Sequence, residues 1–358
     1  MNGEIPPVRT LFIEDSPSSP RSAAGMLGSV SGIEALSTPA DPFAARQAII
    51  SERPDVVVLD LEMERMDAML FLRILMEQSP MPVVALSSLT PQGSKLALDA
   101  LELGAVDVFV RPPTGGIAEE QAAGFTEKLK AAARAKFRPP CPRPAARPET
   151  PHETGKSLIL LGASTGGTEA LREILMRLPA GLPPICIVQH IPQNFSHAFA
   201  ERLNSVSAIH VKEAQDGDAL EPGAAFVAPG DRHMVLARKS SGRLFLQVRD
   251  GQKIMHHRPS IDLMFESAAA VAGPGAVAGL LTGMGRDGAS GLLKLRQSGA
   301  KTFAQDEKTS VVYGMPRAAA DIGAAEKILP LCDMAAHIVR ACGGGPGQAA
   351  KAPNGAPI

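Results

Sequence analysis

The sequence predicts two doubly wound parallel-sheet α/β domains joined by a proline-rich linker, and three observations lead to this fold class. The chain has 358 residues, more than one domain usually holds. Both halves alternate short, continuous apolar runs with helical patterns, as parallel strands covered on both faces do. Proline and arginine dominate the stretch between the halves. We therefore expect domains at 1–136 and 157–342, a linker at 137–156 and a disordered tail at 343–358.

Composition and charge narrow the function classes. Hydrophobic residues make up 45% and charged residues 20%, which is typical of a globular protein. A formal net charge of −1 and an aromatic content of 4% argue against a nucleic-acid partner, which would need a basic surface and stacking platforms. No apolar stretch reaches the roughly 20 residues of a membrane helix, and residues 1–16 turn acidic where a signal peptide would stay apolar. We expect a cytoplasmic protein without membrane insertion.

The four cysteines carry little information. They are scattered and form no CxxC pair, so the sequence predicts neither a disulfide framework nor a zinc site. Cys186 lies in an apolar run near a histidine, but a buried core residue is the favoured interpretation over a thiol nucleophile.

The N-terminal half carries charged groups at the ends of its predicted strands. Strands are expected at residues 8–15, 55–60, 81–88 and 105–113, and helices at 69–78, 94–104 and 119–135. The strand ends bear Glu14, Asp15, Asp60, Ser87 and Arg111. Ligands of open parallel sheets gather at this edge, and converging carboxylates indicate a hard cation such as Mg²⁺. The alternative is that the acids only end strands and cap helices.

The C-terminal half begins with a strand that ends in a glycine-rich turn. Its strands are expected at 157–162, 183–190, 224–229 and 276–283. The turn GASTGG lacks the lysine of a phosphate-binding P-loop and the second glycine of a dinucleotide-binding loop. The spacing Gly162-x-Ser164-x-Gly166 is that of a nucleophile elbow, which exposes a serine hydroxyl. A serine that only caps the following helix is the alternative.

Two further strand ends supply partners for Ser164. His190 ends the next strand, and Asp287 follows the strand at 276–283. A serine hydroxyl needs a base, and the base needs a carboxylate to orient it, so the three residues predict a catalytic triad. Backbone amides after Ser164 and in the turn at 282–285 are expected to form an oxyanion hole. A structural histidine and a helix-capping aspartate remain the alternatives.

The N-terminal motifs resemble a response-regulator receiver domain. They are FIEDS, VVVLDLEMERMDAMLFL and ALSSLTPQGS. The resemblance implies that Asp60 accepts a phosphoryl group and that Ser87 and Arg111 sense it. It further implies that Mg²⁺ is bound by Glu14, Asp15, Asp60 and the backbone of Glu62. The sequence departs from the receiver pattern at several positions, including a missing loop proline and the prolines Pro17 and Pro20 where the first helix should begin. Arg111 replaces a lysine, Val108 an aromatic residue and Ala68 a glycine.

The C-terminal motifs resemble the catalytic domain of the CheB family of chemotaxis protein-glutamate methylesterases. They include GASTGGTEAL, VQHIPQNF, AFVAPGDRHMVL, HHRPSIDLMFES and LLTGMGRDGASGL. The resemblance implies Ser164 as nucleophile, His190 as general base and Asp287 as the orienting acid. It places Thr165 and Met284 near the oxyanion and the substrate.

The same resemblance implies what the protein acts on. Glutamate methyl esters on the cytoplasmic domains of chemoreceptors would be hydrolysed without a cofactor, and glutamines would be deamidated. A histidine kinase would donate phosphate. The flexible linker would also let the receiver dock over the glycine-rich rim of the active site, with phosphorylation shifting the docked population, and we expect a monomer.

Three other hypotheses remain open at the level of sequence. One is a general serine esterase for small molecules, although the order Ser, His, Asp differs from that of α/β-hydrolases. Another is a non-enzymatic signalling adaptor, against which the complete triad argues. The third, a metal site of His233, His256 and His257, lacks any known ligand spacing.

Overall fold

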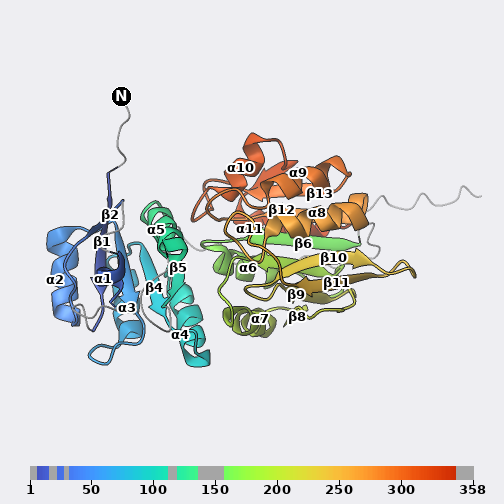
Figure 1. Ribbon diagram of the computed structural model, residues 1–358. Coiled ribbons are helices and arrows are strands. Elements are labelled where there is room, and N and C mark those ends of the chain that lie inside the picture. The colour runs from blue at the N-terminus through green and yellow to red at the C-terminus, as the bar shows by residue number, and fades with distance from the viewer. Residues whose placement is uncertain (1–5, 16–21, 28–31, 112–118, 136–156, 344–358) are drawn as a thin grey trace, which may run out of the picture.

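The computed structural model describes residues 6–15, 22–27, 32–111, 119–135 and 157–343. These residues form two α/β units that lie side by side: an N-terminal unit up to residue 135 and a C-terminal unit from residue 157 (Figure 1). The linker predicted at 137–156, and all but the first residue of the tail predicted at 343–358, lie outside the described residues. No helix in the described ranges is long and apolar enough to cross a membrane.

The N-terminal unit is a five-stranded parallel sheet in the order β2-β1-β3-β4-β5, with helices on both faces. Its strands are β1 (Val8–Ile13), β2 (Ile33–Ala35), β3 (Val56–Asp60), β4 (Val83–Ser87) and β5 (Asp107–Val110). Its helices are α1 (Ala23–Leu27), α2 (Pro42–Glu52), α3 (Ala68–Gln78), α4 (Pro91–Glu102) and α5 (Glu119–Ala133).

Local chemistry sets where these helices begin. The Asp41 carboxylate accepts the amides of Phe43 and Ala44, and Asp67 caps α3 in the same way. Thr90 caps α4, and the proline that follows it suits the first helical position. The strands alternate their side chains between two buried faces, one under α1 and α5 and the other under α2, α3 and α4.

The C-terminal unit is a seven-stranded parallel sheet in the order β14-β13-β12-β6-β7-β9-β8, with a separate antiparallel hairpin of β10 and β11. Its strands are β6 (Leu158–Ala163), β7 (Ile185–Gln189), β8 (His210–Glu213), β9 (Ala224–Val227), β10 (His233–Arg238), β11 (Leu244–Arg249), β12 (Ala276–Leu280), β13 (Lys301–Gln305) and β14 (Lys327–Leu329). Its helices are α6 (Gly167–Leu175), α7 (Phe195–Val206), α8 (Ile261–Val271), the 3-10 turn η1 (Gly273–Gly275), α9 (Ala289–Gln297), α10 (Met315–Asp321) and α11 (Leu331–Ala341).

Register places three strand ends at one edge of this sheet. Gly162 of β6 lies opposite Val188 of β7 on one side and Leu280 of β12 on the other. The residues that directly follow these strands therefore meet at a common edge. Helices α6, α7 and α11 cover one face of the sheet, and α8, α9 and α10 cover the other.

The predicted fold class is confirmed in both units, with two differences in detail. The sequence prediction omitted the strands β2, β8, β13 and β14 of the two sheets. It also omitted the β10–β11 hairpin, which packs against α8. The sequence predicted no disulfide framework, and among the described residues Cys332 is disulfide-bonded whereas Cys186 is a free, buried thiol. Burial raises the pKa of the Cys186 thiol, which fits a core residue and not a nucleophile.

Candidate active site

The turn between β6 and α6 holds Ser164 by its backbone. The Ser164 amide donates to the Thr282 carbonyl at 3.0 Å, and the Ser164 carbonyl accepts from the Gly167 amide at 2.7 Å and from Gln189 Nε2 at 2.9 Å. Gly166 has a φ of 75°, a conformation that favours glycine. A Cβ on Gly283 would lie 2.6 Å from Ser164 Cβ, so this close approach also requires glycine.

His190 and Asp287 form a buried pair beside this turn. His190 Nε2 lies 2.8 Å from Asp287 Oδ2, and their side chains are 7% and 1% exposed. His190 follows β7, whereas Asp287 lies in the loop between β12 and α9. Among the described residues, His190 Nδ1 is buried without a hydrogen-bond partner, and Ser164 and His190 line one pocket. Nδ1 is therefore the ring atom that remains free to accept a proton.

The N-terminus of α8 fixes the Asp287 carboxylate. Ser260 Oγ and the amides of Ile261 and Asp262 donate to it at 2.9, 2.7 and 3.0 Å. Burial by itself would raise the pKa of Asp287, but the hydrogen bond and charge of His190, with these amides, lower it to about 2. The carboxylate is therefore ionised at any pH near neutrality and holds the imidazole in one orientation.

The N-terminal unit reaches the same turn. Thr165 Oγ1 donates to Asp107 Oδ2 at 2.6 Å, and Lys128 of α5 donates to the other oxygen of that carboxylate at 2.7 Å. Thr165 is 4% exposed. The pocket that contains Ser164 and His190 is also lined by Leu101, Val106, Asp107 and Val108 of the N-terminal unit. One unit thus covers the candidate active site of the other.

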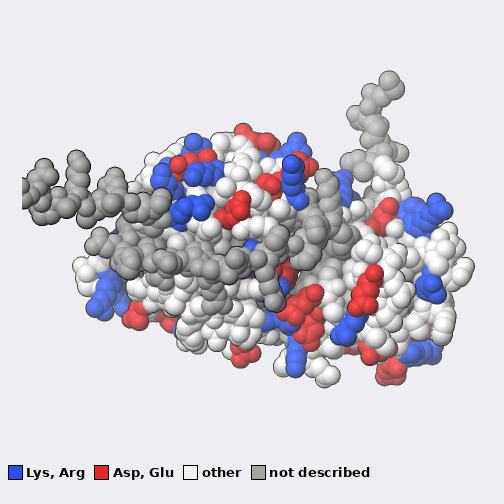
Figure 2. All heavy atoms as spheres, turned by 180° about the vertical axis from the view of Figure 1, so that it is seen from behind, with Lys and Arg blue, Asp and Glu red and all other residues white. Residues whose placement is uncertain are grey.

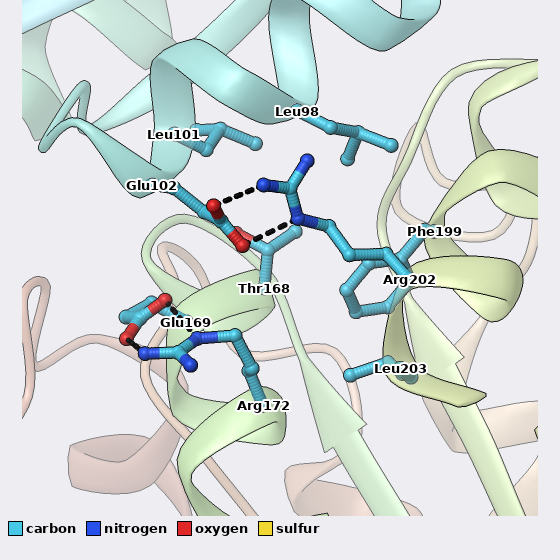
Figure 3. A pocket seen from close by; sticks show the side chains of 9 residues that line it. All are labelled: Leu98, Leu101, Glu102, Thr168, Glu169, Arg172, Phe199, Arg202 and Leu203. Carbon is cyan, nitrogen blue, oxygen red and sulfur yellow. Dashed lines mark hydrogen bonds and ion pairs between the residues drawn. The ribbon is translucent and has the colours of Figure 1, made fainter. Parts of the chain in front are cut away.

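A second set of contacts joins α4 to α6 and α7 beside this pocket. Arg202 of α7 lies within 2.7 Å of Asp99 and also pairs with Glu102, both of α4. Figure 3 shows Arg202 pointing across to Glu102, with Leu98 and Leu101 of α4 facing Phe199 and Leu203 of α7. Arg172 pairs with Glu169 within α6. These ion pairs are partly exposed, so their charges add little to the stability of the contact. The apolar side chains between them exclude water from it.

The acidic cluster of the N-terminal unit is assembled around Asp60. Its Oδ1 accepts the Glu62 amide at 3.0 Å, and its Oδ2 pairs with Arg111. Asp15 accepts the Glu64 amide through Oδ2, while its Oδ1 is buried with no partner among the described residues. An orphaned carboxylate oxygen beside Asp60 fits a cation ligand.

Two predicted residues of this cluster lie differently from the expectation. Glu14 accepts the amides of Ala23 and Ala24 at 2.8 and 3.1 Å, so both of its oxygens are engaged by α1. Burial raises the pKa of Glu14 despite these amides. The Ser87 hydroxyl donates to the Gly93 carbonyl at 2.8 Å and is 1% exposed. In this state neither side chain is free to contact an ion or a phosphoryl group.

The three histidines considered as a metal site are not brought together. Groups of three or more possible metal ligands are absent from the described residues. His233 is buried against the Gln252 carbonyl at 2.9 Å, and His256 is exposed. His257 instead stacks on His190. Met284 is half-buried in the loop after Gly283, on the side of the nucleophile turn.

Three residues of this site were not predicted from the sequence: Asp107, Gln189 and Ser260; a fourth, His257, was considered only as a metal ligand. Gln189 precedes the predicted base and could have been noted as a polar residue in an apolar strand. Asp107 gave no signal, because it contacts the site only through the packing of two separate units.

Comparisons with known proteins agree with both units. The family model of the CheB methylesterase matches residues 159–338, and that of the response regulator receiver domain matches residues 10–115. Protein-glutamate methylesterase/protein-glutamine glutaminase 5 of Anaeromyxobacter dehalogenans is 47% identical, covering 94% of this chain and 97% of its own. The corresponding protein 2 of Rhodospirillum rubrum is 46% identical, covering 93% of this chain and 98% of its own.

A solved structure gives the same assignment for the C-terminal unit. The crystal structure of the Thermotoga maritima CheB methylesterase catalytic domain is 36% identical, with a TM-score of 0.51. It covers 52% of this chain and 98% of that one. With a receiver domain before a methylesterase domain, and with relatives similar over nearly the whole length, this chain belongs to the CheB methylesterase family.

Proposed function

We propose that the chain is a receiver-regulated serine hydrolase that removes methyl groups from glutamate methyl esters on chemoreceptors, and that it deamidates glutamines by the same chemistry. The observation that carries this proposal is the buried His190–Asp287 pair: His190 lines a pocket together with Ser164, and its Nδ1 has no hydrogen-bond partner among the described residues. The names of the relatives support the substrate class.

The chemistry follows from these groups. Ser164 Oγ attacks the ester carbonyl while His190 Nδ1 takes its proton, and the ionised Asp287 stabilises the imidazolium. The imidazolium then protonates the departing methoxide, so methanol leaves and an acyl-serine remains. Water attacks this ester with His190 again as base, which releases the glutamate carboxylate and restores Ser164. For glutamine the leaving group is ammonia. Thr165 and Met284 are proposed to lie near the oxyanion and the substrate, and no step requires a cofactor.

The N-terminal unit supplies the regulation in this proposal. Asp60 accepts a phosphoryl group from a histidine kinase, and Arg111 meets the phosphoryl oxygens. Asp15, Asp60 and the backbone carbonyl of Glu62 would hold Mg²⁺, whose charge would offset that of the phosphoryl group. Glu14 would join only after leaving the α1 amides, and Ser87 would sense the phosphoryl group only after leaving Gly93.

Coverage of the active site by the docked N-terminal unit keeps the basal rate low. Phosphorylation then shifts the population toward an open form. We propose domain limits of 1–136 and 157–342, a monomeric state and a cytoplasmic location, as the sequence predicts. Charge of both signs is interspersed over the face seen in Figure 2, which suits a protein partner better than a nucleic acid.

Methanol release from membranes that carry radiolabelled, methylated receptors tests the proposal. We expect release by the full chain, faster release with acetyl phosphate and Mg²⁺, and poor hydrolysis of p-nitrophenyl acetate. Rapid hydrolysis of the small ester with no methanol from receptors would favour the general esterase instead. No hydrolysis of either, even by residues 157–343 alone, would favour the adaptor.

A further inference from the structure

The ring of His257 lies flat against the ring of His190. Their centroids are 3.7 Å apart and their planes differ by 10°. His257 is partly buried and lies on the loop between β11 and α8, far in sequence from the strand end that carries His190. His257 therefore covers one face of the His190 ring. The edge of that ring contacts Asp287 through Nε2, and His190 lines the pocket with Ser164.

An unusual turn presents this ring. Ile254 and His257 exchange backbone hydrogen bonds of 3.0 and 2.8 Å, which closes a tight turn around Met255 and His256. Both central residues have positive φ, 48° and 69°, although neither is glycine. Side chains with a Cβ adopt this conformation at an energetic cost, and such costs concentrate at functional sites. The turn fixes the backbone of His257 directly next to the candidate base.

The surroundings of His257 keep its ring uncharged. Burial, followed by the charge of His190, lowers the pKa of His257 to about 3, although Asp287 opposes the shift. Lys128, from α5 of the N-terminal unit, and the adjacent His256 act in the same direction as His190. The groups that face His257 thus favour a neutral ring, and a neutral ring presents a π face that attracts a cation.

We propose that His257 is a positioning residue for the general base. Its stacked ring holds the plane of His190 with Nε2 on Asp287, and its π face stabilises the imidazolium that forms in each proton transfer. This inference rests on the proposed triad. It assigns to His257 no contact with substrate.

Paired substitutions separate the ring face from simple packing. His257→Phe keeps a flat aromatic face, whereas His257→Leu keeps apolar bulk without one. We expect His257→Phe to retain kcat for methanol release within about threefold and His257→Leu to lose about fivefold relative to it, the size of a modest cation–π contact. The acid limb of the pH–rate profile should lie at lower pH in His257→Leu, because its imidazolium is less stabilised. His256→Asn, in the same turn but exposed, should match wild type.

A second readout does not depend on the substrate. The rate at which phenylmethanesulfonyl fluoride labels Ser164, followed by mass spectrometry on the full chain, reports activation of the serine hydroxyl. We expect the labelling rate of His257→Phe to lie close to that of wild type and the labelling rate of His257→Leu to be lower. Equal rates and equal acid limbs for Phe and Leu, in both assays, would overturn the role of the ring face. Labelling without methanol release from wild type would instead refute the proposed substrate while leaving this inference standing. If His257→Leu does not fold, a labelling rate of His257→Phe below a third of the wild-type rate would overturn the role of the ring face.

Discussion

Removing the Asp107 carboxylate should open the active site. Asp107 binds the Thr165 hydroxyl at 2.6 Å next to the proposed nucleophile, and its side chain is only 15% exposed. A hydrogen bond to a charged, partly buried group contributes about 1.5–3 kcal/mol. At about 2 kcal/mol, Asp107→Ala should lower the ratio of closed to open forms about 30-fold.

The contacts of Arg202 set a scale for comparison. Its partners Asp99 and Glu102 are 37% and 40% exposed, and pairs of this kind contribute roughly 0–1 kcal/mol each. At about 0.5 kcal/mol for each pair, Arg202→Ala should raise basal activity only about fivefold, and 0.5 M salt should reproduce part of that gain. Lys128→Met should give an intermediate gain, since Asp107 keeps its bond to Thr165 but loses its countercharge.

Initial rates of methanol release, without a phosphodonor, measure these effects. Residues 157–343 alone set the upper limit, since an enzyme without the N-terminal unit cannot be covered by it. Glu127→Ala is the matched control, because Glu127 lies on the same helix as Lys128 but pairs with Lys130 at 52% exposure. Asp107 does not hold the closed form if Asp107→Ala is no faster than wild type while residues 157–343 alone are faster. Closure would then depend on the apolar contacts of α4 and not on this carboxylate.

Three further predictions concern the triad, the receiver site and a buried acid. Ser164→Ala and His190→Ala should each lower turnover by about 10⁴-fold, and Asp287→Asn nearly as much. The Ser164/His190 double variant should be little slower than either single variant. Substantial activity in Ser164→Ala would rule out Ser164 as the nucleophile. Acetyl phosphate should stimulate the esterase rate of wild type weakly, of Arg111→Lys more strongly and of Asp60→Asn not at all. The reason is that the planar guanidinium of Arg111 does not reproduce the geometry of a compact ammonium group. Equal stimulation of wild type and Arg111→Lys would show that arginine at this position does not weaken activation. Burial raises the pKa of Asp262 from 3.8 to about 6, so its charge destabilises the fold above pH 6 and this penalty is relieved as the pH falls toward 4. Asp262→Asn should therefore increase the free energy of unfolding at pH 8, by no more than about 3 kcal/mol, and raise Tm with it. Both should stay unchanged at pH 4, and a gain of equal size at both pH values would show that burial of the charge is not the cause.

Much of the fold could be predicted because its strongest signals are local. Continuous apolar strands such as 55–60 and 157–162 are too long and too rich in branched residues for loops, and the helices between them carry clear caps. Most of the omitted strands are short or lie outside the main sheet: β2 and β14 have three residues each, β8 has four, and β10 pairs only with β11. Their formation depends on tertiary neighbours, which a local pattern does not describe.

The candidate site was predictable to the extent that it follows strand ends. Ser164, His190 and Asp287 each lie just beyond a buried strand, and parallel register places those ends at one edge. Asp107 and His257 could not be found in this way. One reaches the site by packing of two units joined through a linker, and the other through a turn of two residues with positive φ. Neither arrangement leaves a spacing rule in the sequence.

The contacts proposed for regulation meet on a single strand. Asp107 is the first residue of β5 and binds Thr165, while Arg111 directly follows β5 and pairs with Asp60. Four residues of strand span only about 13 Å, so little structure separates the phosphoacceptor from the active site that it would control. A phosphoryl group adds nearly two negative charges beside Arg111 and changes the balance of forces at one end of β5.

The nature of residue 108 decides how that change is transmitted. The receiver pattern that this chain resembles is expected to have an aromatic residue there. Val108 is 3% exposed, and its branched side chain has few rotamers. A buried valine cannot report phosphorylation by swinging outward. We therefore propose that the signal passes through displacement of β5 and of the charges at its two ends, with Arg111 and Asp107 as the coupling residues.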